Sequence, residues 1–455
     1  MLGRAAPQGG GYRKIFSSDE NGTMKQTPAP ASAGWAAKFF AIWTGQAFSL
    51  FGSALVQFAL IWWITQKTGS ATMLATASIF GLLPQILVGP FAGALVDRWN
   101  RRLVLICAEG GIAVVTLALA LVFALGIIQP WHIFLAMGLR SLGSAFQWPA
   151  MQSTTPRLVP EVHLTRIAGL NQTLSGASTI VSPPAGALLL AALPIQGILV
   201  INIGLEMLAI VPLLFLSIPQ PIRPEDSTFG TSSTLAGVWI DFRNGLAYLA
   251  SWPELTTILV MATALNFLFN PAISLMPLLI TKHFHGGALQ LAWIESGWGA
   301  GVIVGGLLLS VWGGFRRKVI TSLVGVIGLG LGVLIAGSAP SNAYPIAILG
   351  IAVSGLMLPM TAGPVLAVIQ AVVRPDLQGR VTALVYSAAQ AMAPVSLLVA
   401  GPTADLLGIR AWYWFGGGAA VLMGISGFFI PAILNIEQNA KKREARGSLP
   451  TLDQP

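Results

Sequence analysis

Long apolar runs, separated by short polar segments, follow one another along most of the chain. A helix that crosses the hydrocarbon core of a bilayer needs about 20 mostly apolar residues, and twelve runs are of this kind. They cover residues 39–64, 71–96, 103–126, 131–153, 168–191, 197–217, 255–281, 289–312, 319–338, 345–372, 382–404 and 412–434. The pattern predicts an all-α polytopic membrane protein with twelve transmembrane helices in two sets of six.

The polar segments divide the chain into five parts. We expect a disordered cytoplasmic tail at 1–36, a six-helix half at 37–217, a cytoplasmic linker at 218–253, a second six-helix half at 254–435 and a cytoplasmic tail at 436–455. Met24 is an alternative start, because the apolar pattern begins only after Trp35. In the linker, apolar residues at helical spacing predict an amphipathic helix, either on the inner membrane surface or packed against the cytoplasmic loops.

The composition excludes other classes of protein. Hydrophobic residues make up 55% of the chain and charged residues only 9%, whereas soluble domains carry about a quarter charged residues. The net charge of +9 does not indicate a nucleic-acid partner, because the basic residues lie between apolar runs rather than in one cluster. Cys107 is the one cysteine, so no internal disulfide is possible.

The distribution of Lys and Arg predicts the orientation. If the N-terminus is inside, the inner segments hold 21 of these residues, and the outer loops hold only Lys67, Lys282 and Arg410. Cytoplasmic loops carry the excess of Lys and Arg in membrane proteins. We therefore expect a multi-pass protein of the inner (plasma) membrane with both termini in the cytoplasm.

Corresponding loops of the two halves are similar. A Pro-acid pair followed by an Arg precedes the fifth span at 160–166 and the eleventh span at 375–380. The charged loop at 93–102 has a counterpart at 306–318, which keeps the basic cluster but lacks the acid, Asp97. These pairs indicate an internal duplication, and many secondary transporters have a binding site between duplicated halves.

The loop at 93–102 reads G-A-L-V-D-R-W-N-R-R. It resembles the signature loop between helices 2 and 3 of the major facilitator superfamily of secondary transporters, with Asn100 in place of a usual glycine. The matching residues are Gly93, Leu95, Asp97, Arg98, Arg101 and Arg102. The resemblance extends over nearly all of the chain after about residue 36, and it implies two pseudo-symmetric six-helix halves.

Two further segments are similar to motifs of the same superfamily. Residues 140–143 in the fourth span resemble its helix-4 arginine motif, with one residue fewer before the glycine. Pro183 and Gly186 in the fifth span match the Gly-Pro-x-x-Gly-Gly motif of proton-coupled drug exporters, while two of the motif's glycines are replaced. The run 140–184 is similar to the macrolide-efflux and enterobactin-exporter branch.

The resemblance also implies a gate. In such transporters the acid of the signature loop meets the cytoplasmic start of helix 11 in the other half, which is here the region of Arg380. A carboxylate is favoured at a helix N-terminus. We therefore expect Asp97, with the other signature residues, to form a latch that holds the cytoplasmic side shut. The latch is asymmetric, because the second half lacks the acid.

Four ionisable residues lie within the predicted spans: Glu109, Arg140, Glu206 and Glu295. Such residues are expensive to bury, so a functional role is the default expectation. In a facilitator-type fold helices 3 and 6 lie outside the cavity, so Glu109 and Glu206 are expected to be mainly structural. Glu109 would then pair with Arg140 or with the loop at 93–102, and it stays a candidate for coupling.

Arg140 and Glu295 are the other candidates for proton coupling or substrate binding. Arg140 lies on a helix that lines the cavity of such a fold, where it serves coupling or substrate positioning, or else forms a static ion pair. In an apolar cavity, where burial disfavours the charged form of a carboxyl group, Glu295 would exchange a proton or neutralise a cationic drug. At a wet outer mouth it would do neither.

Neutral polar residues on the cavity helices of such a fold are candidates for substrate contact: Gln46, Asn266, Asn270 and Gln370. Mostly apolar sites with a few orienting polar groups suit amphipathic ligands. In the eighth span Gly297, Gly301 and Gly305 recur at every fourth residue. This spacing predicts a small-residue face for close helix packing.

The sequence contains no Walker-type nucleotide-binding loop, no metal-ligand cluster and no nucleophile–base constellation. We expect no enzyme activity, no metal and no cofactor. The leading hypothesis is a monomeric, proton-coupled exporter of amphipathic small molecules such as macrolide-like drugs or siderophores, which works by alternating access in the lipid bilayer. The alternative is an importer or lipid flippase of the same fold, and a third hypothesis is a receptor or scaffold that transports nothing.

Overall fold

The structure is a computed structural model that describes residues 16–18, 24–26, 34–96, 99–216, 252–373, 375–434 and 436. The helices of the first half are α1 (Trp35–Thr68), α2 (Ala71–Val96), α3 (Arg101–Ala124), α4 (Pro130–Leu158), α5 (Glu161–Ala192) and α6 (Ile195–Phe215). Those of the second half are α8 (Pro253–Ser274), α9 (Met276–Lys282), α10 (Ala288–Trp312), α11 (Lys318–Ser338), α12 (Tyr344–Val372), α13 (Pro375–Leu407), α14 (Ile409–Gly427) and α15 (Pro431–Leu434). Two short strands, β1 (Phe16–Ser18) and β2 (Met24–Gln26), pair antiparallel ahead of α1, where the sequence pattern predicted no strand.

Long helices dominate the described part of the chain and confirm the all-α polytopic fold. In the described part of the chain, ten of these helices are long and apolar enough to cross a membrane. The two remaining long helices are α4, which carries Arg140, and α14. The amphipathic helix that we predicted in the linker lies outside the described residues.

One predicted span is divided in the structure. The run 255–281 forms α8 up to Ser274 and then the short helix α9 from Met276, with Leu275 between them. Pro277 lies in the first turn of α9. Proline lacks the backbone N–H that would continue the hydrogen-bond ladder of α8, so Pro277 weakens the helix at this joint.

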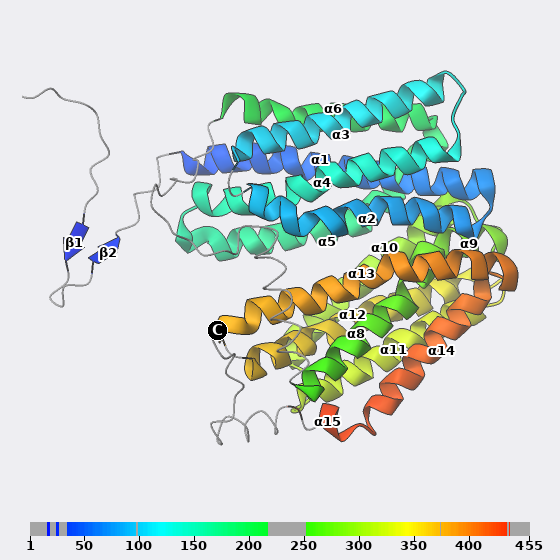
Figure 1. Cartoon of the computed structure of the whole chain (residues 1–455). Helices are drawn as coiled ribbons and strands as arrows, with labels where there is room; N and C mark the ends of the chain where they lie inside the picture. Colours follow the sequence, from blue (N-terminus) through cyan, green and yellow to red (C-terminus); the bar gives the residue numbers. More distant parts are fainter. Residues whose placement is uncertain are drawn as a thin grey trace, which may run out of the picture.

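The two halves form separate helix bundles that pack through two pairs of helices. Helix α2 packs against α13, and α5 packs against α10. Figure 1 shows the bundles side by side at the end near α9 and diverging toward the end where α1 begins and α6 ends. The contact between the halves is therefore tightest at the α9 end.

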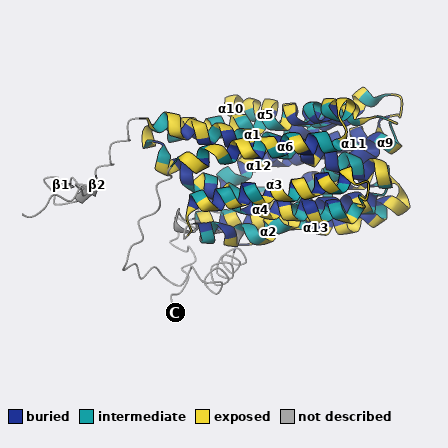
Figure 2. Cartoon of the chain, turned by 90° about the horizontal axis from the view of Figure 1, so that it is seen from above, coloured by how far each residue is buried: buried dark blue, intermediate teal, exposed yellow. Residues whose placement is uncertain are grey.

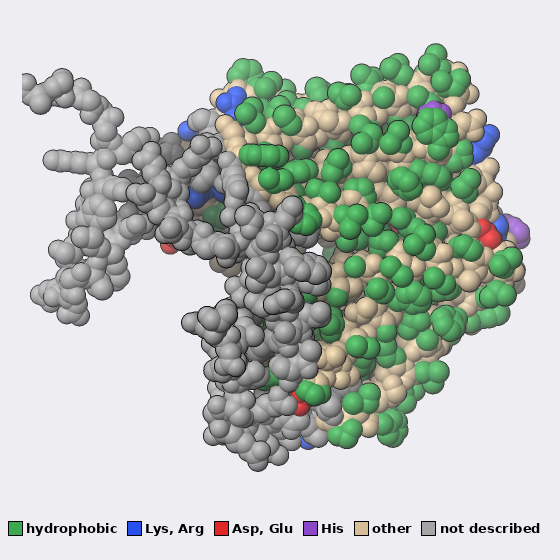
Figure 3. All heavy atoms as spheres, viewed as in Figure 1, with side chains coloured by type: hydrophobic (Ala, Val, Ile, Leu, Met, Phe, Trp, Pro, Cys, Tyr) green, Lys and Arg blue, Asp and Glu red, His purple; other side chains and the backbone are tan. Residues whose placement is uncertain are grey.

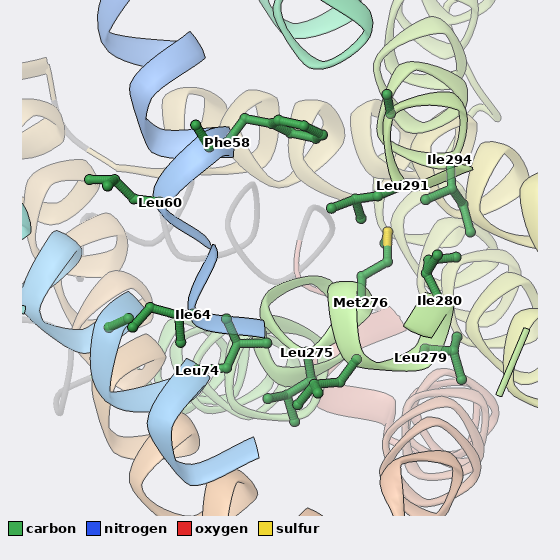
Figure 4. Close-up of a cluster of buried hydrophobic side chains, with 14 of the residues drawn as sticks. Phe58, Leu60, Ile64, Leu74, Leu275, Met276, Leu279, Ile280, Leu291 and Ile294 are labelled. Atoms are coloured by element: carbon green, nitrogen blue, oxygen red, sulfur yellow. The ribbon is translucent and has the colours of Figure 1, made fainter. Parts of the chain in front are cut away.

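Apolar side chains from both halves fill the contact at the α9 end. Figure 4 shows Phe58, Ile64 and Leu74 of the first half beside Leu275 and Met276 of the second. All five belong to one cluster of buried hydrophobic residues. This shared core joins α1 and α2 to α8 and α9.

Asp405, near the end of α13, adds polar contacts to the same end. Its Oδ1 accepts a hydrogen bond from the backbone N–H of Ala71 at 2.7 Å, and its Oδ2 accepts from that of Thr72 at 2.9 Å. The Ser70 hydroxyl donates to Oδ2 at 2.8 Å. Gly401, one turn earlier, permits the approach, because a Cβ there would lie 2.9 Å from Thr72 Cα. A carboxylate of the second half thus caps the first turn of α2 in the first half.

Glycines allow close helix packing within the second half. A Cβ on Gly301 would lie 2.2 Å from the backbone oxygen of Ala352, and one on Gly305 would lie 2.0 Å from that of Leu356. Both contacts are made with α12, so any larger residue at these two positions would force α10 away from α12. The predicted small-residue face in the eighth span is confirmed.

The outer surface of the bundles is apolar. Buried residues lie on the inward helix faces and exposed residues on the outward faces (Figure 2). On α3, Val114, Leu117 and Leu121 form one exposed stripe at helical spacing. In the face shown in Figure 3, hydrophobic side chains cover the middle and the visible charged side chains lie near the ends. Such a surface suits the hydrocarbon core of a bilayer.

Candidate functional site

A cluster of polar side chains is buried in the first half, where α1, α3, α4 and α6 meet. Each helix contributes residues that share one face, because their spacing is three, four or seven positions. The members are Gln46, Ser49 and Ser53 on α1, Glu109 and Thr116 on α3, Arg140 and Gln147 on α4, and Asn202 and Glu206 on α6. Neither glutamate has exposed surface. The cluster therefore places two carboxyl groups and one guanidinium inside the bundle.

The carboxyl group of Glu109 is surrounded by hydrogen-bond donors. Gln46 Nε2 donates to Glu109 Oε1 at 2.8 Å, and Gln147 Nε2 donates to the same oxygen at 2.5 Å. The Ser49 hydroxyl oxygen lies 2.8 Å from Glu109 Oε2. All four of these residues come from α1, α3 and α4, so Glu109 ties these helices together.

The carboxyl group of Glu206 has a similar environment. Its Oε2 also lies 2.8 Å from the Ser49 hydroxyl oxygen. Its Oε1 accepts from the Ser53 hydroxyl and from Asn202 Nδ2, both at 3.2 Å. The two glutamates are thus joined by one serine hydroxyl.

Arg140 approaches Glu206 through neutral side chains. Its Nη1 donates to the Thr116 hydroxyl and, at 3.0 Å, to Asn202 Oδ1, while Nη2 donates to the Ser53 hydroxyl at 3.0 Å. Ser53 and Asn202 in turn donate to Glu206. The hydrogen bonds described for Arg140 thus lead toward Glu206 and not to Glu109, so the pairing of Arg140 with Glu109 stays a prediction.

A second candidate region lies between the halves. A cavity of about 510 Å³ is lined by α1, α2 and α5 on one side and by α8, α9 and α10 on the other. Glu295 is the one charged residue among its described lining residues, which otherwise have apolar, hydroxyl or amide side chains. Trp298, one turn further along α10, also lines it and stacks on Phe269 with ring centroids 5.3 Å apart. Glu295 therefore lies in an inter-half cavity.

The helix-5 motif residues lie at the same cavity. Pro183 lines it together with Phe58 of α1. A Cβ on Gly186 would lie 2.9 Å from Phe58 Cδ1, so this glycine provides room for the phenyl ring. The motif thus shapes the contact between α1 and α5 beside the cavity.

The remaining predicted substrate-binding residues are spread over other places. Gln46 belongs to the buried cluster rather than to the inter-half cavity. Asn266 lines a smaller, mostly apolar cavity of about 270 Å³ inside the second half. Asn270 donates to the backbone oxygen of Asn266 at 2.9 Å, and Gln370 is exposed on α12. The structure brings the side chains of Asn266 and Asn270 together, with Asn270 Nδ2 donating to Asn266 Oδ1 at 3.3 Å, but it does not gather all four.

Part of the predicted gate is described. The side chain of Asn100 caps α3 by accepting from the backbone N–H groups of Arg102 and Leu103. Arg102 donates from Nε to the Leu213 backbone oxygen and from Nη2 to that of Leu214, each at 2.5 Å. A guanidinium at the end of α6 is favoured there by the helix dipole. Arg102 therefore holds α3 and α6 together within the first half.

The other gate residues are described less fully. Arg101 is buried, and Gly93 lies within α2, where an added Cβ would meet nothing within 4 Å. Asp97 and Arg98 lie outside the described residues, and the side chain of Arg380 is not described. The latch stays a prediction.

Comparison with known proteins identifies the family. The model of the Major Facilitator Superfamily matches residues 42–273 and again residues 255–452. The chain belongs to the Major Facilitator Superfamily. It is therefore a multi-pass membrane transporter and not an enzyme, as the sequence predicted.

Curated relatives of this superfamily member extend over most of its length. It is 31% identical over 394 residues to "Macrolide efflux protein A" of Streptococcus pyogenes, which covers 86% of this chain and 95% of the relative. It is 30% identical over 332 residues to the protein of that name from Enterococcus faecalis, covering 72% and 100%. It is 25% identical over 401 residues to "Multidrug efflux pump Tap" of Mycolicibacterium fortuitum, covering 86% and 95%.

Solved structures of low sequence identity share the fold. The nucleoside transporter NupG matches with a TM-score of 0.64 at 12% identity, covering 87% of this chain and 98% of that one. A bacterial homologue of the human lysosomal transporter Spinster, described as inward-facing and unoccupied, matches with a TM-score of 0.62 at 13% identity, covering 91% and 98%. These likenesses support the superfamily fold.

Proposed function

We propose that this transporter exports amphipathic, cationic small molecules by alternating access and that protons drive the export. The observation that carries the proposal is the cavity of about 510 Å³ shared by the two halves, with Glu295 in its lining. Its volume falls within the range of about 300–1,000 Å³ that is usual for small-molecule sites. The names of the efflux relatives support the direction of transport.

The lining of the cavity supports a cationic substrate. Glu295 offers a carboxylate, and the indole of Trp298 lies on the same side of α10, three positions further along. Aromatic faces and carboxylates both attract amines. The apolar and hydroxyl side chains of the remaining lining suit the uncharged part of an amphipathic molecule.

The orientation is part of the proposal. Lys67, Lys282 and Arg410 lie at or next to the ends of α1, α9 and α14, at the end where the halves meet. The many basic residues of the opposite end face the cytoplasm under the positive-inside rule. In this orientation the halves meet on the outer side, and the predicted latch of Asp97 would close the inner side at another stage of the cycle.

An efflux assay tests the proposal. Expression in an efflux-deficient bacterium is expected to lower the accumulation of cationic amphipathic compounds, and an ionophore that collapses the proton gradient is expected to abolish the effect. The panel pairs each cationic compound with an uncharged analogue. Unchanged accumulation of every compound would favour an importer or a non-transporting receptor.

The variant Glu295→Gln tests the role of the carboxylate in the cavity. Export of the cationic compounds is expected to fall about tenfold, which corresponds to a lost interaction of about 1.4 kcal/mol, while export of the uncharged analogues persists. Glu161→Gln is the matched control, because Glu161 is exposed at the start of α5. Equal loss for charged and uncharged compounds would remove Glu295 from charge recognition.

A further inference from the structure

The hydroxyl group of Ser49 lies between two carboxyl groups. Its oxygen is 2.8 Å from Glu109 Oε2 and 2.8 Å from Glu206 Oε2. A serine hydroxyl has one hydrogen to donate, and an ionised carboxylate has none. If both glutamates were ionised, one of these short contacts would bring two acceptor oxygens together without a hydrogen between them. Both contacts are hydrogen bonds only when one carboxyl group is protonated.

The other hydrogen bonds of the two carboxyl groups leave the Oε2 oxygens, beside Ser49, as the position of the proton. Oε1 of Glu109 already accepts from Gln46 and Gln147. Oε1 of Glu206 already accepts hydrogen bonds from the Ser53 hydroxyl and from Asn202 Nδ2. The Oε2 oxygens are thus the ones that face Ser49. A proton on either Oε2 is donated to the Ser49 oxygen, while the Ser49 hydrogen is donated to the opposite Oε2.

The charge of the cluster also indicates one proton shared by the two carboxyl groups. Among the described residues its ionisable members are Glu109 on α3, Arg140 on α4 and Glu206 on α6, and α1 contributes only neutral groups. Neither glutamate is exposed, and Arg140 is 8% exposed. One proton makes the cluster neutral, with one ionised carboxylate opposite one guanidinium. Without the proton a net negative charge would be buried, which is strongly unfavourable.

We infer that Glu109, Ser49 and Glu206 form a proton-binding site that holds one exchangeable proton in the state seen here. The two carboxyl groups exchange that proton through Ser49, which accepts a hydrogen from one side as it gives up its own to the other. On release, the O–H bond of a carboxyl group breaks and the proton passes to water. The role of this release in driving transport rests on the proposed function, whereas the shared proton does not. The site is separate from Glu295, which is assigned to the substrate.

Infrared spectroscopy of the purified, full-length protein tests the shared proton directly. The comparison uses the Glu295→Gln background, because a protonated Glu295 would absorb in the same region. At neutral pH this protein is expected to show the carbonyl band of a protonated carboxylic acid, which shifts in heavy water. Adding Glu206→Gln or Glu109→Gln is expected to remove the band, because the single remaining carboxylate balances Arg140. Glu161→Gln in the same background is the control and should leave the band unchanged.

Two infrared results would overturn the inference. One is the absence of the band in the Glu295→Gln protein at neutral pH, and the other is a band that persists in both double variants. Folding is not a confounding factor, because glutamine has the shape of a protonated glutamate and keeps the cluster neutral. A thermal unfolding curve for each variant checks this point.

Transport in inverted membrane vesicles tests the use of the proton. The probe is a fluorescent cationic amphiphile that the wild-type protein exports. Glu109→Gln and Glu206→Gln are expected to abolish its uphill accumulation under an imposed pH gradient, while exchange of labelled for unlabelled probe continues. Undiminished uphill accumulation in both variants would overturn the coupling role. If the wild-type protein moves no compound, the proposed function fails, and the infrared comparison still decides whether the proton site exists.

Discussion

At the scale of single residues, the charge of Arg140 is balanced through intermediaries. Its guanidinium donates to Ser53 and Asn202, and both of these donate to Glu206. A chain of neutral groups in a buried site polarises along its length, so the charges interact without direct contact. This arrangement makes the total charge of the cluster more important than any single bond.

The dependence on total charge gives a stability prediction. Glu109→Gln and Glu206→Gln, made separately, should unfold near the wild-type temperature, because each leaves one carboxylate for Arg140. The double variant leaves Arg140 uncompensated and should lose about 3–5 kcal/mol, the usual effect of removing a buried partner charge. Thermal unfolding of the purified proteins measures the difference.

The matched control for the double variant is the triple variant that also carries Arg140→Met. It contains no charge in the cluster and should recover much of the lost stability. Additive effects of the two glutamate substitutions, with no recovery in the triple variant, would show that the cluster does not behave as one charge-balanced unit.

The sequence predicts the charged members of this cluster but not its organisation. Glu109 and Arg140 stand out because ionisable residues are rare within membrane spans. Ser49 and Asn202 do not stand out, since neutral polar residues are common there. Their spacing from Gln46 and Glu206 places each pair on one helix face, but the sequence does not say which faces meet. The contact of four helices, which joins the two glutamates, is visible only in the fold.

At the scale of elements, α2 and α13 each have an aspartate near the C-terminal end. One of these aspartates caps the start of the other helix, and we predict the same of the second. The end of α13 provides Asp405, which caps the start of α2. The sequence places Asp97 just after α2, and we predict that it meets the start of α13. The same two helices would then hold each other at opposite ends, each time through a carboxylate at a helix N-terminus.

Loss of the Asp405 contacts should favour opening at the α9 end. Asp405→Ala removes three hydrogen bonds, and a lost helix cap of about 1 kcal/mol changes the ratio of closed to open molecules about fivefold. Spin labels at Lys67 and Leu407, with Cys107 replaced by serine, measure the distance across this end. Asp405→Asn is the control, because its amide oxygen still accepts a hydrogen bond. An unchanged distance distribution in Asp405→Ala would exclude a latching role.

The predicted latch at the other end has the opposite consequence. Asp97→Asn should weaken closure of the cytoplasmic side and lower transport, while substrate binding stays largely intact. Binding of the fluorescent probe to purified protein and its export from cells separate the two effects. Transport at the wild-type rate would refute the latch.

The sequence predicts elements better than the joints between them. The apolar runs locate the long helices because hydrocarbon requires each backbone group to bond within its own helix. The joint between α8 and α9 was missed, because proline is also tolerated inside membrane helices, as Pro183 is in α5. Tertiary packing at the α9 end decides whether a proline breaks a helix or is accommodated inside it, and a run of apolar residues does not predict that packing.

At the scale of the whole molecule, the two ends differ in charge while the surface between them is apolar. The end opposite α9, where α1 begins, carries Arg101, Arg102, Arg316 and Arg317, and the α9 end carries few basic residues. A bilayer with a negative inner surface attracts the first end. The proposed orientation rests on this difference over the whole molecule rather than on any one loop.

Cysteine labelling tests the proposed orientation. In a background with Cys107→Ser, which removes the native thiol, single cysteines replace Lys67 at the end of α1 or Arg317 beside α11. Both positions are exposed, so both thiols react once the reagent reaches their side of the membrane. A membrane-impermeant maleimide should label the cysteine at 67 in intact cells and the cysteine at 317 only after the cells are opened. The reverse pattern would place the end where the halves meet in the cytoplasm and would overturn the proposed orientation.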